Sequence, residues 1–86
     1  MPRALSIKRS IVPLAERAKY LERLKARQEY YQRLNCEFRV FEEAALTGAF
    51  IEFVEAADAA TVEAAHTAAP EPVLDPARIY TEVELA

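Results

Sequence analysis

The sequence predicts an α+β domain in which a four-stranded antiparallel sheet carries two helices on one face. Apolar and polar residues alternate with period two in four short segments, which is typical of strands with one buried face. Two other segments lack glycine and proline and have helical patterns. Because the order is strand, helix, strand, strand, helix, strand across all 86 residues, we predict a single domain, residues 1–86.

The first predicted strand covers residues 5–12, where apolar and polar side chains alternate from Leu5 to Lys8. Pro13 ends this strand and suits the first turn of a helix. Residues 14–34 are rich in Ala, Leu, Glu, Lys and Arg, so we predict a long helix there. Its apolar stripe, expected to pack on the sheet, consists of Leu14, Ala15, Ala18, Tyr20, Leu21, Leu24, Tyr31 and Leu34.

The middle of the chain predicts a β-hairpin. Asn35 is expected to end the long helix in the left-handed conformation. Strands are predicted at residues 36–41 and 49–55, both with period-two alternation. The connection between them is short and holds Gly48, the only glycine, so the two strands are expected to pair directly.

The last third of the chain predicts a second helix and a fourth strand. Asp58 is the expected N-cap of a helix that runs to about Thr67. Three prolines between residues 70 and 76 predict a stiff loop. Residues 79–85 then alternate with period two, which predicts the final strand.

Two strand–helix–strand units joined by a hairpin predict the ferredoxin-like βαββαβ arrangement, with the spatial strand order 4-1-3-2. The charges agree with this order. Residues 1–40 carry ten Lys or Arg and four Asp or Glu, a balance of +6, whereas residues 41–86 have a balance of −9. The order places Lys8 on the first strand between Glu52 and Glu82, where opposite charges on neighbouring strands attract.

Period two also divides the strand residues between the two faces of the sheet. The helix-covered face is predicted to hold Leu5, Ile7, Phe38, Val40, Ile51, Phe53, Ile79, Val83 and Leu85. The other face is predicted to hold Ser6, Lys8, Arg39, Phe41, Phe50, Glu52, Val54, Tyr80, Glu82 and Glu84. Because aromatic residues on an exposed face are costly and the core of so small a domain is thin, we expect this second face to pair with that of a second copy.

Composition excludes several kinds of site. Cys36 is the only cysteine, so no disulfide within the chain is expected, and we predict that it is a small buried hydrophobic residue. His66 is the only histidine, so we expect no metal site. The first residues lack the apolar core of a secretory signal, and no apolar run approaches membrane-spanning length. We therefore expect a cytoplasmic protein with no membrane partner and no cofactor.

The element order over the whole chain resembles the dimeric α+β barrel superfamily, which includes antibiotic-biosynthesis monooxygenases, stress-responsive barrel proteins and polyketide cyclases. Residues 50–66 are similar to the third strand and following helix of these proteins, where a histidine often lies near the helix end. The resemblance implies that two sheets close face to face into a homodimeric barrel. The chain has no tryptophan, so it lacks the Asn–Trp–His set of the haem-degrading members, and it lacks the first-strand histidine of the cyclases.

The resemblance implies a small-molecule-binding barrel protein, with a monooxygenase-like or cyclase-like enzyme as its catalytic form. His66 is the candidate acid/base group, because its ordinary pKa lies near neutrality. Tyr31 or Tyr20 of the long helix is expected to lie close to it, and Tyr31 is its candidate partner. The simpler interpretation is a half-solvated histidine that stabilises the C-terminus of a helix. The alternative function is a non-catalytic homodimeric binding or assembly module whose sheet serves only to dimerise.

Candidate ligand contacts come from the polar and aromatic residues of the predicted barrel, where a small polar or aromatic ligand is expected. These residues are Tyr20, Arg39, Glu52, Tyr80 and Glu82. The simpler interpretation of the charged ones, together with Lys8, is a set of cross-strand ion pairs. Tyrosines at helical spacing are likewise common in a plain core.

RRM domains share this element order, so nucleic-acid binding is another possible function. Residues 48–53 partly resemble the aromatic third-strand motif of those domains, and Phe50 is predicted on the open face. The leading basic residue of that motif is missing, however, and the first strand has no aromatic residue. Glu52, Glu82 and Glu84 would repel phosphate from the same face, so we expect no nucleic-acid partner.

Overall fold

The structure is a computed structural model that describes residues 2–69 and 78–85. The predicted proline loop at 70–76 lies outside the described residues. The elements in chain order are β1 (Ala4–Ile11), the short 3₁₀ helix η1 (Leu14–Glu16), α1 (Arg17–Arg33), β2 (Glu37–Glu42), β3 (Ala49–Ala56), α2 (Ala59–Thr67) and β4 (Ile79–Thr81).

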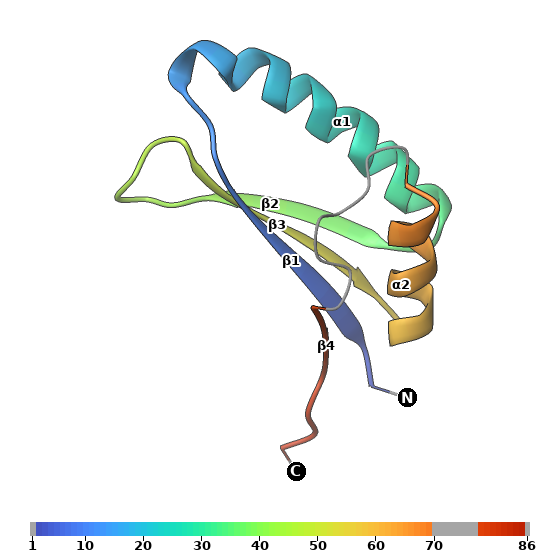
Figure 1. The fold of residues 1–86 in the computed structure, drawn as a ribbon. Helices are drawn as coiled ribbons and strands as arrows, with labels where there is room; N and C mark the ends of the chain where they lie inside the picture. Colours follow the sequence, from blue (N-terminus) through green and yellow to red (C-terminus); the bar gives the residue numbers. More distant parts are fainter. Residues whose placement is uncertain (1, 70–77, 86) are drawn as a thin grey trace.

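The four strands form one antiparallel sheet in the order β2-β3-β1-β4, which is 4-1-3-2 when read from the β4 edge. The predicted α+β class and four-stranded antiparallel sheet are therefore confirmed. β1 and β3 pair along their whole length, from Ala4 opposite Ala56 to Ile11 opposite Ala49. Figure 1 shows this pair at the centre of the sheet, with β4 short and at one edge.

The last strand is much shorter than predicted. β4 ends at Thr81, which lies opposite Ala4, the first residue of β1. The amide of Glu82 still donates to the carbonyl of Arg3 at 2.7 Å, but β1 offers no partner farther on. Val83, Glu84 and Leu85 consequently leave the sheet as an exposed tail, although their alternation is that of a strand.

The local signals at the ends of the helices are confirmed. Asn35 has a φ of 60°, the left-handed conformation expected after α1. The side chain of Asp58 accepts a hydrogen bond from the amide of Thr61 at 2.7 Å and so caps α2. Gly48 has a φ of 92°, and a Cβ added there would lie 2.6 Å from the carbonyl oxygen of Val12. Glycine is therefore required where the hairpin touches the end of β1.

Both helices cover the same face of the sheet (Figure 1), but the prediction of which β1 and β3 residues face them is wrong. Ser6 on β1 and Glu52 on β3 lie under the helices, where they are only 8% and 4% exposed. Both were predicted on the open face, as were the buried residues Phe50 and Val54. The apolar residues predicted under the helices instead lie on the open face in these two strands: Leu5, Ile7, Ile51 and Phe53.

The cause is a set of polar partners that only the helices provide. Glu52 is bonded by side chains of α1, and Ser6 by a side chain of α2. A period-two pattern fits either face, so the partners decide the orientation. In β2 the prediction is confirmed, because Phe38 and Val40 face the helices whereas Arg39 and Phe41 do not.

The stripe that α1 turns to the sheet is narrower than predicted, although three of the predicted residues are confirmed in it. Its buried residues are Tyr20, Leu24 and Tyr31, whereas Leu14 and Leu21 are exposed. The predicted positions Ala15, Ala18 and Leu34 are also exposed. The core between the layers consists of Ala4, Tyr20, Leu24, Tyr31, Cys36, Phe38, Phe50, Val54, Ala56, Val62 and Ala65.

The open face of the sheet is more apolar than predicted. Phe41 and Phe53 meet edge to face on it, with ring centroids 5.6 Å apart. Arg39 and Glu55 lie at its rim and pair with each other and with neighbouring charges. The apolar side chains of this face are Leu5, Ile7, Phe41, Ile51, Phe53 and Tyr80. We call these six residues the open-face patch.

Candidate functional site

His66 lies in the last turn of α2 and is buried between the helices and the sheet, with 6% of its surface exposed. Its Nε2 lies 2.5 Å from the Oγ of Ser6, and its Nδ1 lies 3.2 Å from the hydroxyl of Tyr31. Each hydroxyl can donate to an unprotonated ring nitrogen or accept from a protonated one. The two contacts therefore suit a neutral imidazole in either tautomer.

The surroundings also favour the neutral form. Burial lowers the pKa of His66 below its ordinary value, and the nearby Arg27 charge lowers it further. Burial raises the pKa of Tyr31, so both groups are uncharged at pH 7. His66 does lie at the end of a helix, as the simpler interpretation has it, but it is buried and not half-solvated.

Glu52 forms a second buried polar group beside the first. The hydroxyl of Tyr20 donates to its Oε2 at 3.0 Å, and Nη1 of Arg27 donates to its Oε1 at 2.6 Å. Burial, followed by the Glu52 charge, raises the pKa of Tyr20 strongly, so this hydroxyl remains a donor. The carboxylate is held by one neutral and one charged donor, both from α1.

Within the part of the chain that the structure describes, two cavities adjoin these groups. One of about 10 Å³ lies between them and is lined by residues of both, including Ser6, Glu52 and His66. A volume of this size holds one water at most. The second cavity, of about 220 Å³, is lined by Lys8, Ser10, Ile11, Val12, Tyr20, Arg23 and Arg27. Lys8 and Arg27 line both cavities and so separate the larger one from the histidine.

The structure brings some of the predicted site residues together and separates others. His66 and Tyr31 are in contact, and Tyr20 and Glu52 are bonded beside them. The remaining three predicted ligand contacts lie elsewhere: Arg39 and Tyr80 on the open face and Glu82 in the C-terminal tail.

The predicted ion-pair cluster of Lys8, Arg39, Glu52 and Glu82 does not form. Lys8 does lie opposite Glu52 in the β1–β3 register. Glu82, however, lies beside Arg3, beyond the end of the β1–β4 pairing. Arg39 is on the opposite face of the sheet and pairs with Glu37 at 2.8 Å.

The sequence prediction missed Ser6 and Arg27. Ser6 was assigned to the open face because serine alternates with leucine and isoleucine in β1. Arg27 follows Tyr20 by seven residues and precedes Tyr31 by four, the helical spacing that places all three on one face. That spacing is the signal which would have identified it.

The position proposed for base stacking in an RRM-like protein is not available. Phe50 is buried under the helices, with its ring centroid 4.8 Å from that of Tyr20. The guanidinium carbon of Arg17 lies 5.3 Å from the centroid of the same ring. The side chain is thus occupied on the helix side and does not reach the open face.

No protein family model, curated protein or solved structure matches the chain. Across residues 2–69 and 78–85, no three His, Cys, Asp or Glu side chains are grouped so that they could hold a metal ion. None of the helices in the described part of the chain combines the length and the apolar character needed to cross a bilayer.

Proposed function

We propose that this chain is a homodimeric α+β barrel protein of ferredoxin-like fold that binds a small anionic molecule between its helices and its sheet. The strand order, the two helices on one face and the apolar open face support the barrel. The buried polar groups and the basic cavity beside them support binding.

The observation that carries the binding proposal is the burial of Glu52. A carboxylate that is 4% exposed, in the layer where a domain of 86 residues must build its core, has a large desolvation cost. A buried ion pair often contributes less stability than apolar residues of the same size. We infer that the Glu52–Arg27–Tyr20 group is kept for recognition, with Glu52 fixing the position of Arg27.

The charges around the larger cavity determine the class of ligand. Lys8, Arg23 and Arg27 line it together with the hydroxyl groups of Ser10 and Tyr20. Three cations and two hydroxyls suit a carboxylate or phosphate. The volume of about 220 Å³ is below the roughly 300 Å³ at which sites for drug-sized molecules begin, so the ligand is small.

In the catalytic form of the proposal, His66 is the acid/base group and Tyr31 its partner. A neutral buried imidazole can accept a proton at pH 7, and the Tyr31 hydroxyl orients it through Nδ1. The cavity that touches His66 admits one water at most, so the ligand reaches it only when the side chains of Lys8 and Arg27 move apart.

The barrel itself follows from the open-face patch. The patch places six apolar side chains on one face of a thin domain, and a second copy that covers them removes their surface from water and so stabilises the domain. A two-fold pairing of identical faces does this with one surface, and the charges of Arg39 and Glu55 would form its polar rim.

Benzoate and inorganic phosphate are suitable probes of the binding site. Titration of the ¹⁵N-labelled protein should shift the amides of Lys8 and Arg23 saturably, and Arg23→Gln should weaken binding about fivefold or more. Arg33→Gln, at the far end of the same helix, is the matched control and should bind as the wild type does. Unsaturated, uniform shifts with both anions would reject the proposed ligand class.

The second candidate function is a non-catalytic assembly module. It is favoured by the size of the cavity at His66 and by the complete pairing of buried polar atoms within the described residues. Under this alternative, His66→Ala leaves both the dimer and any anion binding unchanged. Under the first proposal, His66→Ala leaves the dimer intact but abolishes turnover or alters ligand binding.

A further inference from the structure

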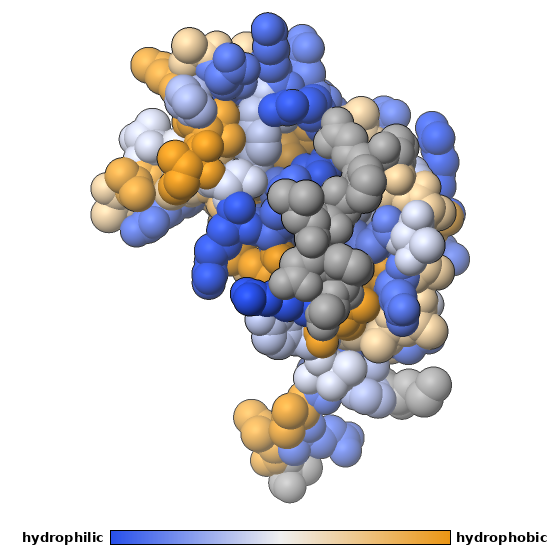
Figure 2. Space-filling view, in the orientation of Figure 1, coloured by the Kyte–Doolittle hydropathy of each residue, from blue (hydrophilic) through white to orange (hydrophobic). Residues whose placement is uncertain are grey.

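The C-terminal tail, residues 82–85, carries two large apolar side chains that nothing in its own copy covers among the described residues. Val83 is 73% exposed and Leu85 is 92% exposed. The backbone of the tail is joined to the sheet by the hydrogen bond from the Glu82 amide to the Arg3 carbonyl. Figure 2 shows the hydrophobic surface of this tail projecting away from the body of the domain.

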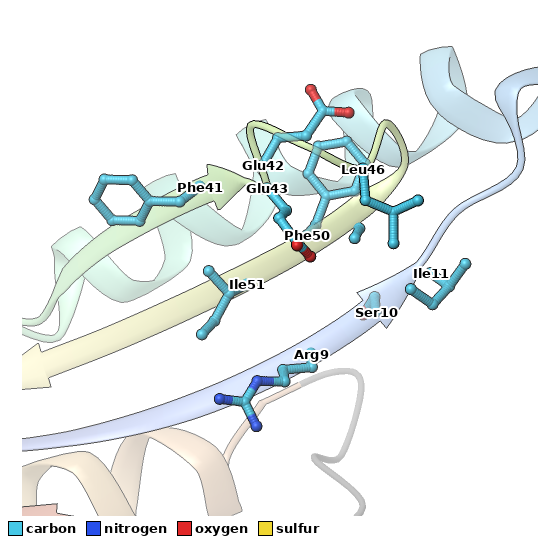
Figure 3. A pocket seen from close by; sticks show the side chains of 10 residues that line it. Arg9, Ser10, Ile11, Phe41, Glu42, Glu43, Leu46, Phe50 and Ile51 are labelled. Carbon is cyan, nitrogen blue, oxygen red and sulfur yellow. The ribbon is translucent and has the colours of Figure 1, made fainter.

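A groove lined largely by apolar side chains lies at the opposite end of β1. It has a volume of about 430 Å³ and lies between the end of β1 and the β2–β3 hairpin. Figure 3 shows Arg9, Ile51 and Phe41 side by side across the three strands, with Leu46 and Ile11 at the end of the groove. Ile11, Phe41 and Leu46 are all more than half exposed. Figure 2 shows a second gathering of hydrophobic surface at this end of the molecule.

We propose that the tail of one copy packs into this groove on a second copy. The tail of the second copy packs in the same way into the groove of the first. This inference rests on the homodimer of the proposed function. It adds to that dimer a reciprocal exchange of residues 82–85 in an extended conformation.

Chain length excludes insertion of the tail into its own groove. β1 runs from Ala4 to Ile11, about 23 Å at roughly 3.3 Å per residue, and the tail leaves the sheet at the Ala4 end. Residues 82–85 span at most about 14 Å. Because β4 is antiparallel to β1, the tail also points away from Ile11. A second copy is therefore the source of the tail that fills the groove.

Symmetry fits a second copy, and one cation of the groove, Arg9, suits the acidic tail. When two sheets pack face to face about a two-fold axis perpendicular to β1, the Ala4 end of one β1 lies over the Ile11 end of the other. Glu82 and Glu84 of the tail then approach Arg9, which forms no ion pair within residues 2–69 and 78–85. Glu42 and Glu43 also line the groove, and of these Glu42 is paired with Arg17, so the acidic side chains of the tail must lie on the Arg9 side.

A cross-linking experiment between two differently labelled copies tests the exchange directly. Both copies carry Cys36→Ala, which removes the native thiol. One copy also carries Leu85→Cys, and its ¹⁵N-labelled partner carries Leu46→Cys. After mixing and mild oxidation, mass spectrometry should detect the mixed disulfide at least tenfold above the yield of a control pair in which Glu22→Cys, on the exposed side of α1, replaces Leu46→Cys.

The outcomes separate this proposal from the dimer on which it rests. An equal yield from the Leu46→Cys and Glu22→Cys pairs, in a mixture that light scattering shows to be dimeric, overturns the exchange and leaves the sheet-to-sheet dimer standing. A monomeric mixture overturns both. As a second measurement, the double variant Val83→Ser/Leu85→Ser should raise the dimer dissociation constant about tenfold or more, and an unchanged constant counts against the exchange.

Discussion

The hydroxyl of Tyr31 on α1 lies 3.2 Å from Nδ1 of His66 on α2, and the two rings meet edge to face with centroids 5.7 Å apart. Tyr31 also stacks on Phe38 of β2, at a centroid distance of 5.5 Å. The contact therefore joins both helices and the sheet at one buried point. On the other side of the imidazole, the hydroxyl of Ser6 contacts Nε2, so β1 is also joined to this point.

Tyr31→Phe removes the hydroxyl but keeps the ring. Nδ1 of the buried His66 then loses its partner, so we expect the free energy of unfolding to fall by about 1–3 kcal/mol. Urea denaturation measures the change. Lys25→Arg, at an exposed position of the same helix, should change stability by less than about 0.5 kcal/mol. Equal effects from the two variants would contradict the bonding described for Tyr31.

Burial of a neutral His66 makes stability depend on pH. The pKa of His66 is lowered in the folded state, so below its ordinary value of 6.5 the unfolded chain binds a proton that the folded chain does not. The free energy of unfolding should therefore fall as the pH decreases from 6.5 toward the folded-state pKa. His66→Gln should flatten this decrease between pH 6.5 and pH 5. An identical pH profile for the variant would show that His66 is not buried in neutral form.

The ionised carboxylate of Glu42 should stabilise the fold near neutral pH, and acid should remove this contribution. Arg17 donates to both of its carboxylate oxygens, at 2.7 and 3.0 Å, and the Gly48 amide donates at 2.9 Å. These bonds lower the pKa of Glu42 to about 2 from 4.5. Its contribution is thus present above pH 4.5 and is lost as the pH falls toward 2.

The comparison of Glu42→Gln with wild type at pH 6 and pH 3 measures that contribution. The stability difference should be larger at pH 6 than at pH 3. Glu43→Gln, which changes the exposed neighbouring carboxylate, is the control, and its effect on stability at pH 6 should be smaller than that of Glu42→Gln. A difference of the same size at both pH values would mean that the Arg17 pair does not depress the pKa of Glu42.

Gly48→Ala should destabilise the fold by about 1 kcal/mol or more, because the added methyl meets the Val12 carbonyl and the left-handed φ disfavours alanine. The Gly48 carbonyl also accepts from the Val12 amide at 2.8 Å, so any shift of the hairpin weakens this bond. Thermal unfolding of the variant, compared with Thr47→Ala at the exposed neighbouring position, provides the test. Stability equal to that of Thr47→Ala would contradict the close approach.

Phe53→Asp tests the open face. Phe53 lies opposite Ile7 on one side and Arg39 on the other, near the middle of the open-face patch. A carboxylate there cannot be buried without a partner, so we expect the variant to stay folded but to dimerise at least tenfold more weakly. Leu21→Asp, on the exposed side of α1, is the control and should leave dimerisation unchanged. Circular dichroism checks that both variants are folded.

The sequence predicted the elements and their order because these depend on local signals. Asp58 and Asn35 mark the ends of helices through their own hydrogen bonds and backbone conformation. Gly48 marks the hairpin because its positive φ is a backbone conformation that glycine adopts readily. The end of β4 could not be predicted from its alternation, because it depends on where its partner β1 begins.

The faces of β1 and β3 could not be predicted because β3 carries apolar side chains on both faces, and because β1 turns its more polar face to the helices. Glu52 lies under the helices only because Tyr20 and Arg27 are there to bond it, and those contacts join residues far apart in the sequence. For the site, the contact of His66 with Tyr31 was anticipated from their types and helical positions. Ser6 was missed because a serine in a strand gives no sign of which face it occupies.

Size-exclusion chromatography with light scattering, at micromolar concentration and near-neutral pH, tests most directly whether a second copy covers Leu5, Ile7, Phe41, Ile51, Phe53 and Tyr80. The mass should be twice the 9.7 kDa of one chain. A folded species of 9.7 kDa would contradict the barrel, because its apolar sheet face would then be stable in water alone.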